Sequence, residues 1–305
     1  MAEGRGAGGL VETAVSLASE RMLRRLEWHV LRRLEGRLQG DFRTALRGGG
    51  TDFHGLRAYR DGDDVRHIDW NVTARMDELH VREYLQEREL TAWLLLDRSP
   101  SMDFGTAGRT KEQVLCELSA AIALLLVGGG NRVGAILSDG ERHWTLPPRQ
   151  GRHQVVALVN ELQRPVEGAS RTQLDVLLRS AGRMLRRRSL VVVVSDFFCE
   201  PGWERPLGQL AVRHELVALR LVDPAENSLP DAGMLYVQDA ESGEQLLVDS
   251  SDPVLRRRLG QLWAERDEAV RHCIARCGVR PHVVSTDDDL LSALLRIARA
   301  GRARR

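Results

Sequence analysis

The sequence predicts an α/β fold in which helices cover both faces of a doubly wound, mainly parallel, Rossmann-like sheet. Two apolar runs, at residues 93–96 and 190–194, have the length and composition of strands buried on both faces. Segments with apolar residues at helical spacing lie between the strand-like runs. Strands that alternate with helices form a parallel sheet with right-handed crossovers. An N-terminal helix, a loop and strand extension, and a small β-hairpin insertion are predicted in addition.

Length and composition exclude several classes of protein. A chain of 305 residues, with 43% hydrophobic and 29% charged residues, can bury one large core plus a smaller unit. The formal net charge of +1 provides no overall attraction to nucleic acid or to a membrane. The four cysteines lack paired Cys-x-x-Cys spacing, which argues against a zinc site. Neither a secretory signal nor an apolar run of ~18 residues is found, so we expect a cytoplasmic protein without an integral membrane segment.

Four segments are predicted along the chain. They are a disordered start at 1–9, an amphipathic helix and a signature segment at 10–90, the α/β domain at 91–300, and a basic tail at 301–305. Apolar residues recur at helical spacing from 10 to 38, and arginines occupy the other faces of this helix. Glutamates dilute its charge, so packing against the domain or a partner is favoured, with peripheral membrane contact as the alternative.

The signature segment, residues 47–90, begins with a glycine-rich loop at 47–53. This loop lacks the Lys-Ser/Thr ending of a phosphate-binding loop. Acids, arginines and aromatic residues then alternate, and the group that could form a metal-dependent hydrolase or nuclease site is Asp61, Asp63, Asp64, His67 and Asp69. Alternatively, the acids pair with neighbouring arginines in a structural network. The balanced charge favours the network, because a catalytic metal cluster keeps excess negative charge. Residues 80–84 are predicted to form a strand.

The remaining elements follow from periodicity and turn signals. Helices are predicted at 111–127, where Gly128 is a natural C-cap, and at 154–162, 174–185, 252–276 and 287–299. Strands are predicted at 132–137, 143–146, 190–194, 214–222 and 279–285. Asp139 and Gly140 form the turn of a hairpin that joins the first two of these strands. A second hairpin, at 234–237 and 245–249, precedes the long helix.

Three oxygen-bearing side chains directly follow the first apolar run. Asp97, Ser99 and Ser101 are therefore expected just beyond the carboxyl end of a central strand, which is where ligands bind in such sheets. One carboxylate and two hydroxyls within five residues suit a hard cation such as Mg²⁺. Alternatively, these side chains cap the helix that starts near Thr110, or a shorter turn.

Two motifs resemble known families. Asp97-x-Ser99-x-Ser101 resembles the metal-ion-dependent adhesion site of von Willebrand factor type A domains. The motif at 62–70, Gly-Asp-Asp-x-Arg-x-Ile-Asp-Trp, followed by Thr-Ala-Arg at 73–75, resembles the bacterial family called domain of unknown function 58. This resemblance covers roughly residues 40–300. Members of that family resemble von Willebrand factor A domains and are commonly encoded beside MoxR-type AAA+ ATPases.

The resemblance implies a metal site and a mode of action. The implied ligands of Mg²⁺, Mn²⁺ or Ca²⁺ are Asp97, Ser99, Ser101, Thr172 and Asp196, with Ser170 as a substitute for the threonine. An ion that keeps one open position would take an acidic residue from another protein. We therefore expect a non-enzymatic, metal-ion-dependent interaction module, acting as adaptor or substrate-recognition partner of a MoxR-type AAA+ ATPase in complex maturation or stress response. No nucleic-acid partner is expected. The alternative is the hydrolase or nuclease built on the acids of the signature segment.

Overall fold

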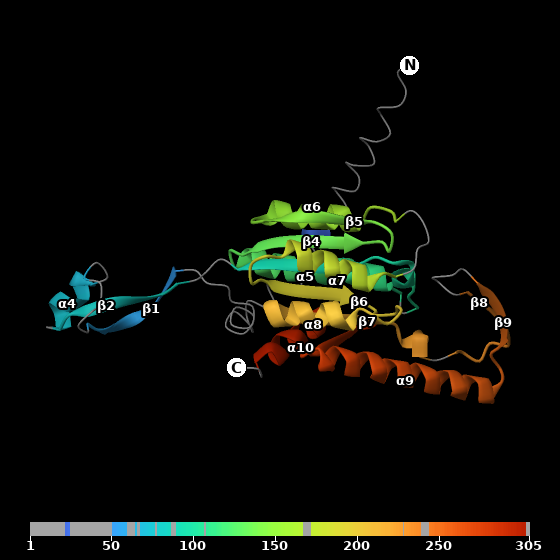
Figure 1. Cartoon of the computed structure of the whole chain (residues 1–305). Coiled ribbons are helices and arrows are strands. Elements are labelled where there is room, and N and C mark those ends of the chain that lie inside the picture. Colours follow the sequence, from blue (N-terminus) through green and yellow to red (C-terminus); the bar gives the residue numbers. More distant parts are fainter. Residues whose placement is uncertain are drawn as a thin grey trace, which may run out of the picture.

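The computed structural model shows one central sheet with helices on both faces, and smaller elements at its margins (Figure 1). It describes residues 22–24, 51–59, 65, 68–76, 78–86, 90–106, 108–166, 172–227, 229–238 and 244–302. The predicted disordered start at 1–9, most of the predicted helix at 10–38 and the end of the basic tail lie outside these residues.

The central sheet has six strands in the order β10-β7-β6-β3-β4-β5. The strands are β3 (Thr91–Asp97), β4 (Arg132–Ser138), β5 (His143–Arg149), β6 (Leu190–Ser195), β7 (Glu215–Val222) and β10 (Pro281–Ser285). All neighbouring pairs are parallel except β4 and β5, which form the hairpin predicted around Asp139 and Gly140. The predicted doubly wound, mainly parallel α/β fold is confirmed.

Two helical layers cover the sheet, and successive side chains of a strand point alternately toward one layer and the other. Leu94 and Leu96 point to the core beneath α5 (Lys111–Gly128), α6 (Arg152–Leu162) and α10 (Leu290–Arg302). Leu95 points to the opposite core beneath α7 (Leu174–Met184), α8 (Glu204–Arg213) and α9 (Pro253–Arg276). All three leucines are fully buried. The central strand therefore anchors both cores, as the unbroken apolar run predicts.

Two small antiparallel sheets lie outside the central sheet. One pairs β1 (Thr51–Ala58) with β2 (His80–Gln86), and α4 (Trp70–Met76) lies between them in sequence. The other pairs β8 (Met234–Gln238) with β9 (Gln245–Asp249), which confirms the predicted hairpin insertion. Among the described helices, none has the length and apolar character needed to cross a lipid bilayer.

Three elements were not predicted. β1 begins within the segment interpreted as a glycine-rich loop, and α4 exposes most of its side chains, so it carries no apolar stripe. In α8, Pro206 and Gly208 obscure the helical pattern. Pro206 lies in the first turn, where a missing N–H breaks no helical hydrogen bond. Of the predicted N-terminal helix, residues 22–24 are helical, and Leu23 is fully buried in the core beneath α5.

Candidate metal centre

Asp97 and Asp196 lie at the carboxyl ends of neighbouring strands, because β3 pairs directly with β6. Only 3% of Asp97 is exposed. Its Oδ2 accepts a hydrogen bond from Ser195 Oγ at 2.6 Å, and its Oδ1 accepts one from the Ser99 amide at 3.0 Å. No described basic side chain bonds to it. Asp97 is thus a buried carboxylate that is hydrogen-bonded but has no counter-charge.

This environment disfavours the charged form of Asp97. Burial raises the pKa of its carboxyl, and the nearby charge of Asp196 raises it further. The hydrogen bonds from Ser195 and Ser99 offset only part of this effect, so the pKa reaches about 6. A cation beside Asp97 would stabilise the ionised form.

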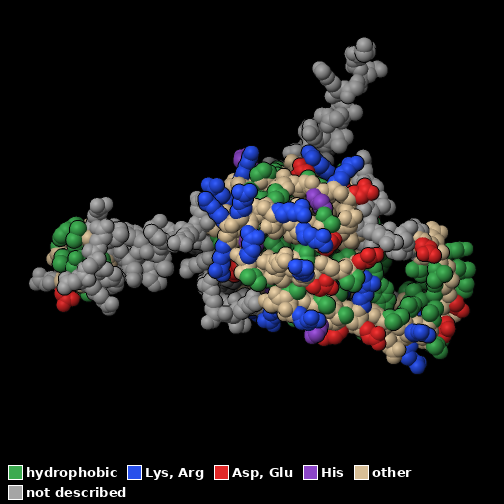
Figure 2. Space-filling view, in the orientation of Figure 1, with side chains coloured by type: hydrophobic (Ala, Val, Ile, Leu, Met, Phe, Trp, Pro, Cys, Tyr) green, Lys and Arg blue, Asp and Glu red, His purple; other side chains and the backbone are tan. Residues whose placement is uncertain are grey.

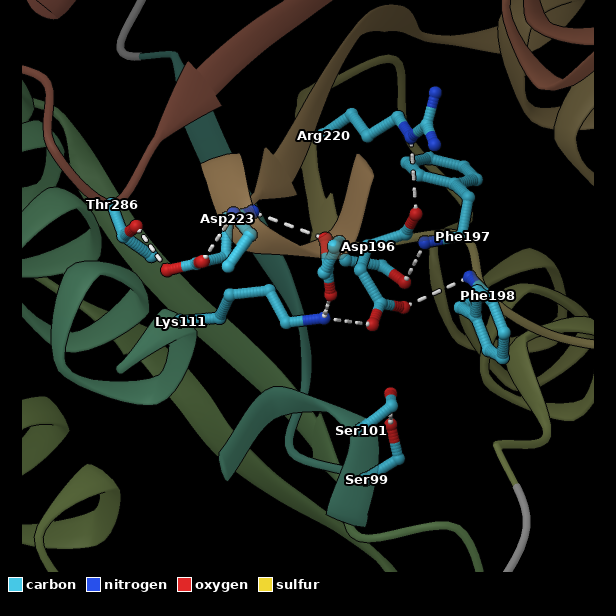
Figure 3. A network of polar contacts seen from close by, with 12 residues as sticks. Ser99, Ser101, Lys111, Asp196, Phe197, Phe198, Arg220, Asp223 and Thr286 are labelled. Atoms are coloured by element: carbon cyan, nitrogen blue, oxygen red, sulfur yellow. Dashed lines mark hydrogen bonds and ion pairs between the residues drawn. The ribbon is translucent and has the colours of Figure 1, made fainter. Parts of the chain in front are cut away.

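Two buried hydroxyls lie directly after this carboxylate. The 3₁₀ turn η3 (Pro100–Asp103) folds the chain back so that Ser99 Oγ and Ser101 Oγ approach to 3.2 Å (Figure 3). They are 2% and 5% exposed. The alternative that these residues cap α5 is wrong, because Thr110 caps that helix in a reciprocal pair with Gln113. Asp97 does close a short turn through the Ser99 amide.

Lys111, which sequence analysis missed, occupies the other side of the site. Its side chain runs from α5 to the sheet edge, where Nζ lies 2.7 Å from Asp196 Oδ2 and 2.5 Å from Glu226 Oε1 (Figure 3). Burial opposes its charge, but the two carboxylates outweigh burial and raise its pKa. Lys111 is 1% exposed and is the only lysine in the chain, which otherwise uses arginine. A single lysine in an arginine-rich chain was the one sequence feature that could have pointed to this residue.

A strained residue holds Asp196 in place. Phe197 has φ 57°, and among the described residues it alone adopts positive φ without being glycine. Its amide donates to Ser195 Oγ, and its buried ring packs edge-on against Trp203 at 5.2 Å. The next amide, of Phe198, donates to Asp196 Oδ1 at 2.8 Å. Such backbone strain costs roughly 1–3 kcal/mol and persists only where packing over-determines it.

A third carboxylate at this edge is fully satisfied. Asp223, at the end of β7, accepts hydrogen bonds from the hydroxyls of Thr106 and Thr286, each at 2.6 Å. Amides of Thr106 and Ala225 also donate to it. Burial opposes its ionisation, but these bonds outweigh burial and lower its pKa to about 2. Of the three strand-end acids, Asp97 is therefore the one whose hydrogen bonds do not offset the effect of burial on its charge.

The structure brings four of the five predicted ligands to one edge of the sheet. Thr172 is 7% exposed and lies two residues before α7, while Ser170 lies outside the described residues. No group of three or more His, Cys, Asp or Glu side chains in the described part of the chain is placed to hold a metal. An ion here would depend on the serine hydroxyls, a donor set that fits a hard cation such as Mg²⁺.

Sequence comparison assigns the family. A family model described as "Protein of unknown function DUF58" matches residues 55–269. The chain belongs to the DUF58 family. The relatives of this DUF58 protein include the "Uncharacterized protein Rv1480" of Mycobacterium tuberculosis, 39% identical over 282 residues, which cover 92% of this chain and 89% of that protein. A second relative, the "Uncharacterized protein MAV169" of Mycobacterium avium, is 32% identical over 165 residues, which cover 52% of this chain and 94% of that protein.

Solved structures similar to this DUF58 protein share little sequence with it. BatB from Bacteroides thetaiotaomicron is 16% identical and has a TM-score of 0.46, covering 71% of this chain and all of that one. The SpRpn10 VWA domain is 11% identical and has a TM-score of 0.39, and the match covers 68% of this chain and 94% of that one. The predicted family is confirmed.

The acidic cluster of the signature segment is described only at Asp69. Asp69 is 8% exposed, and its Oδ1 accepts hydrogen bonds from the amides of Asn71 and Val72 at the start of α4. This carboxylate therefore has a structural role as a helix cap. Asp61, Asp63, Asp64 and His67 lie outside the described residues.

Proposed function

We propose that this DUF58 protein is a non-enzymatic interaction module that binds a partner through a divalent cation. The observation that carries the proposal is Asp97, a buried carboxylate without counter-charge beside the hydroxyls of Ser99 and Ser101. These three residues, with Asp196 and Thr172, would hold Mg²⁺, Mn²⁺ or Ca²⁺. When bound, the ion would supply an open coordination position that an acidic side chain of another protein can fill.

Local charge supports a bound cation. Asp97, Asp196 and Glu226 contribute three negative charges, and the Lys111 ammonium contributes one positive charge. The ionised carboxylate of Asp223 at the same edge adds a further negative charge, so the edge keeps an excess of negative charge that favours a cation. Because Lys111 already satisfies Asp196 Oδ2, that carboxylate has only part of its capacity left for an ion. Neutral hydroxyls then make up much of the ligand set, which leaves coordination positions open to a partner.

The partner we propose is a MoxR-type AAA+ ATPase or one of its client proteins. Family resemblance supports this partner, since members of the family are commonly encoded beside such ATPases. The module would act as adaptor or substrate-recognition subunit in protein complex maturation or in a stress response.

Calorimetric titration with MgCl₂ or MnCl₂ tests the ion site directly. The wild type should bind one ion, and the double variant Asp97→Ala, Ser99→Ala should not. Asp139→Ala is the matched control, because this acid closes the β4–β5 turn at the same edge of the sheet. Capture experiments with Mg²⁺ or with chelator, followed by identification of a MoxR-type ATPase, test the partner. Retention of that ATPase by the double variant and under chelation would contradict the bridging mechanism.

The hydrolase or nuclease alternative makes a different prediction for the signature segment. Replacing Asp63 and Asp64 with alanine should leave a hydrolase folded and abolish turnover of a nuclease or phosphoesterase substrate. If the acids form a structural network, the same variant should lose stability while having no activity to lose. Asp69, whose carboxylate caps α4, supports the structural interpretation at its own position.

A further inference from the structure

The β8–β9 hairpin is a two-stranded sheet that carries exposed apolar side chains on both faces. The strand register places Leu235, Val237, Leu246 and Val248 on one face. The other face carries Met234, Tyr236 and Leu247 together with the polar residues Gln238, Gln245 and Asp249. Tyr236 is 77% exposed and Leu246 is 66% exposed. A two-stranded sheet is marginally stable in water by itself, and exposed apolar faces of this kind mark interaction sites. Figure 2 shows the apolar patch over β8 and β9 at one end of the molecule.

The base of the hairpin is fixed to the domain while its faces stay open. Ser250 is fully buried, and its Oγ donates to the Gly233 carbonyl at 2.7 Å and accepts from the Ala232 amide at 3.0 Å. Arg256 of α9 pairs with Asp231 just before β8. We call β8 and β9 together the arm. Because the arm is held at its base, its position relative to α9 is defined, and its exposed faces are presented outward.

The arm belongs to a strongly acidic stretch of the chain. Residues 223–255 contain no Lys, Arg or His, although Arg256, Arg257 and Arg258 follow at once in α9. The exposed acids among the described residues of this stretch are Asp231, Glu244, Asp249 and Asp252. Asp223 and Glu226 belong to the candidate metal centre, and Asp239 and Glu241 lie outside the described residues. The net charge of +1 hides this local excess. A surface that covers the arm must therefore be apolar where it meets the faces and basic at its rim.

A groove of about 230 Å³ lies between α7 and α8. Its floor is formed by Leu178, Pro206 and Leu210, which are buried, so the surface that it presents to solvent is mainly basic. Arginines stand at its rim: Arg179, Arg183 and Arg213. Val212, beside the groove on α8, is 89% exposed. Figure 2 shows basic side chains gathered over this part of the molecule, well away from the arm. The groove has room for about one large side chain.

We propose that the arm of one copy of this chain docks into the α7–α8 groove of a second copy. Tyr236 is the side chain that enters the groove, since it is the most exposed aromatic of the arm and arginines pack favourably against aromatic faces. The exposed acids of the arm and its border, Glu244 and Asp249, then face the arginine rim. The contact joins two different surfaces, so it is heterologous. One small arm buries less than a standard interface of ~1,600 Å², so the association is weak and depends on concentration.

Sedimentation velocity of the full chain at several protein concentrations tests this proposal. The average mass of the wild type should rise with concentration in low salt, and the dissociation constant should increase roughly tenfold in ~0.5 M NaCl because the charged rim is screened. The arm variant Tyr236→Ser, Leu247→Ser and the groove variant Arg183→Glu should each remain monomeric. Leu262→Ser and Arg280→Glu are the matched controls, because both sites are exposed and lie away from the arm and the groove. They should associate as the wild type does.

A mixing experiment identifies the occupant of the groove. The arm variant retains an intact groove, and the groove variant retains an intact arm, so an equimolar mixture should form a mixed dimer and no larger species. Monomeric wild type at every concentration would overturn the proposal. Self-association of the groove variant by itself would also overturn it, because the arm would then be covered by another arm. Circular dichroism of each variant verifies that the fold is intact.

Discussion

Replacing Lys111 with methionine removes the buried cation of the candidate metal centre while keeping most of the side chain that packs around it. The variant leaves Asp196, whose side chain is 3% exposed, and Glu226, whose side chain is 23% exposed, without their shared partner. Removing one member of a buried ion pair typically costs 3–5 kcal/mol, because an uncompensated charge remains. Glu226 can turn toward water and Asp196 keeps the Phe198 amide, so we expect the lower end, about 3 kcal/mol.

Thermal and urea unfolding measure this loss. For a domain of this size, about 3 kcal/mol corresponds to a fall in Tm of roughly 6–12 °C. The control is Arg271→Met on α9, where the arginine is 47% exposed and pairs with Asp267 one helical turn away. Exposed pairs of this kind contribute less than about 1 kcal/mol. If Lys111→Met costs no more than Arg271→Met, the buried ion pairs do not stabilise the fold and the reasoning is refuted.

The same variant also reports on the ion. Without the ammonium, Asp196 regains its full capacity to bind a cation, and the local charge of Asp97, Asp196 and Glu226 becomes −3. Mg²⁺ should therefore bind the variant more tightly than the wild type and restore part of the lost stability, since a ligand of the folded state stabilises it by mass action. A loss of stability that Mg²⁺ does not change would indicate that Lys111 supports the fold but not the ion site.

Three further predictions concern single positions. The pKa of Asp223 in the folded protein is about 2, below its ordinary 3.8. Its ionisation therefore adds roughly 2 kcal/mol to the free energy of unfolding above pH 4, and this contribution is lost as the pH falls toward 2. Urea unfolding measured from pH 6 to pH 2 should show this loss of stability in the wild type and not in Asp223→Asn. Gly134→Ala should lower the free energy of unfolding by about 1–3 kcal/mol, because the added Cβ would lie 3.0 Å from the Trp93 ring. Gly208→Ala in α8 should raise the free energy of unfolding by ~0.5–1 kcal/mol, because alanine favours the helix and the added Cβ meets only ordinary contacts. Calorimetry of both variants measures these changes. Burial raises the pKa of Cys116 to about 12, so one of the four cysteines should resist a thiol reagent until the protein is unfolded, as mass spectrometry of the labelled protein can show.

Local patterns predicted most of the central domain. The apolar runs at 93–96 and 190–194 correctly predicted β3 and β6, and the acids that follow them were correctly expected at one edge of the sheet. Of the three elements that were not predicted, two have weak sequence patterns. α4 buries no apolar stripe, and α8 contains a proline and a glycine.

The sequence by itself determined the alternation of strands and helices and the place of Asp97, Ser99 and Ser101, because periodicity and strand ends are local properties of a chain. Only the tertiary structure decided what surrounds Asp97 and Asp196. Lys111 meets an acid 85 residues away and another 115 residues away, and such a pairing leaves no periodic trace in the sequence. The tertiary structure likewise exposed both faces of the β8–β9 hairpin, because burial depends on which elements the fold brings to cover a strand.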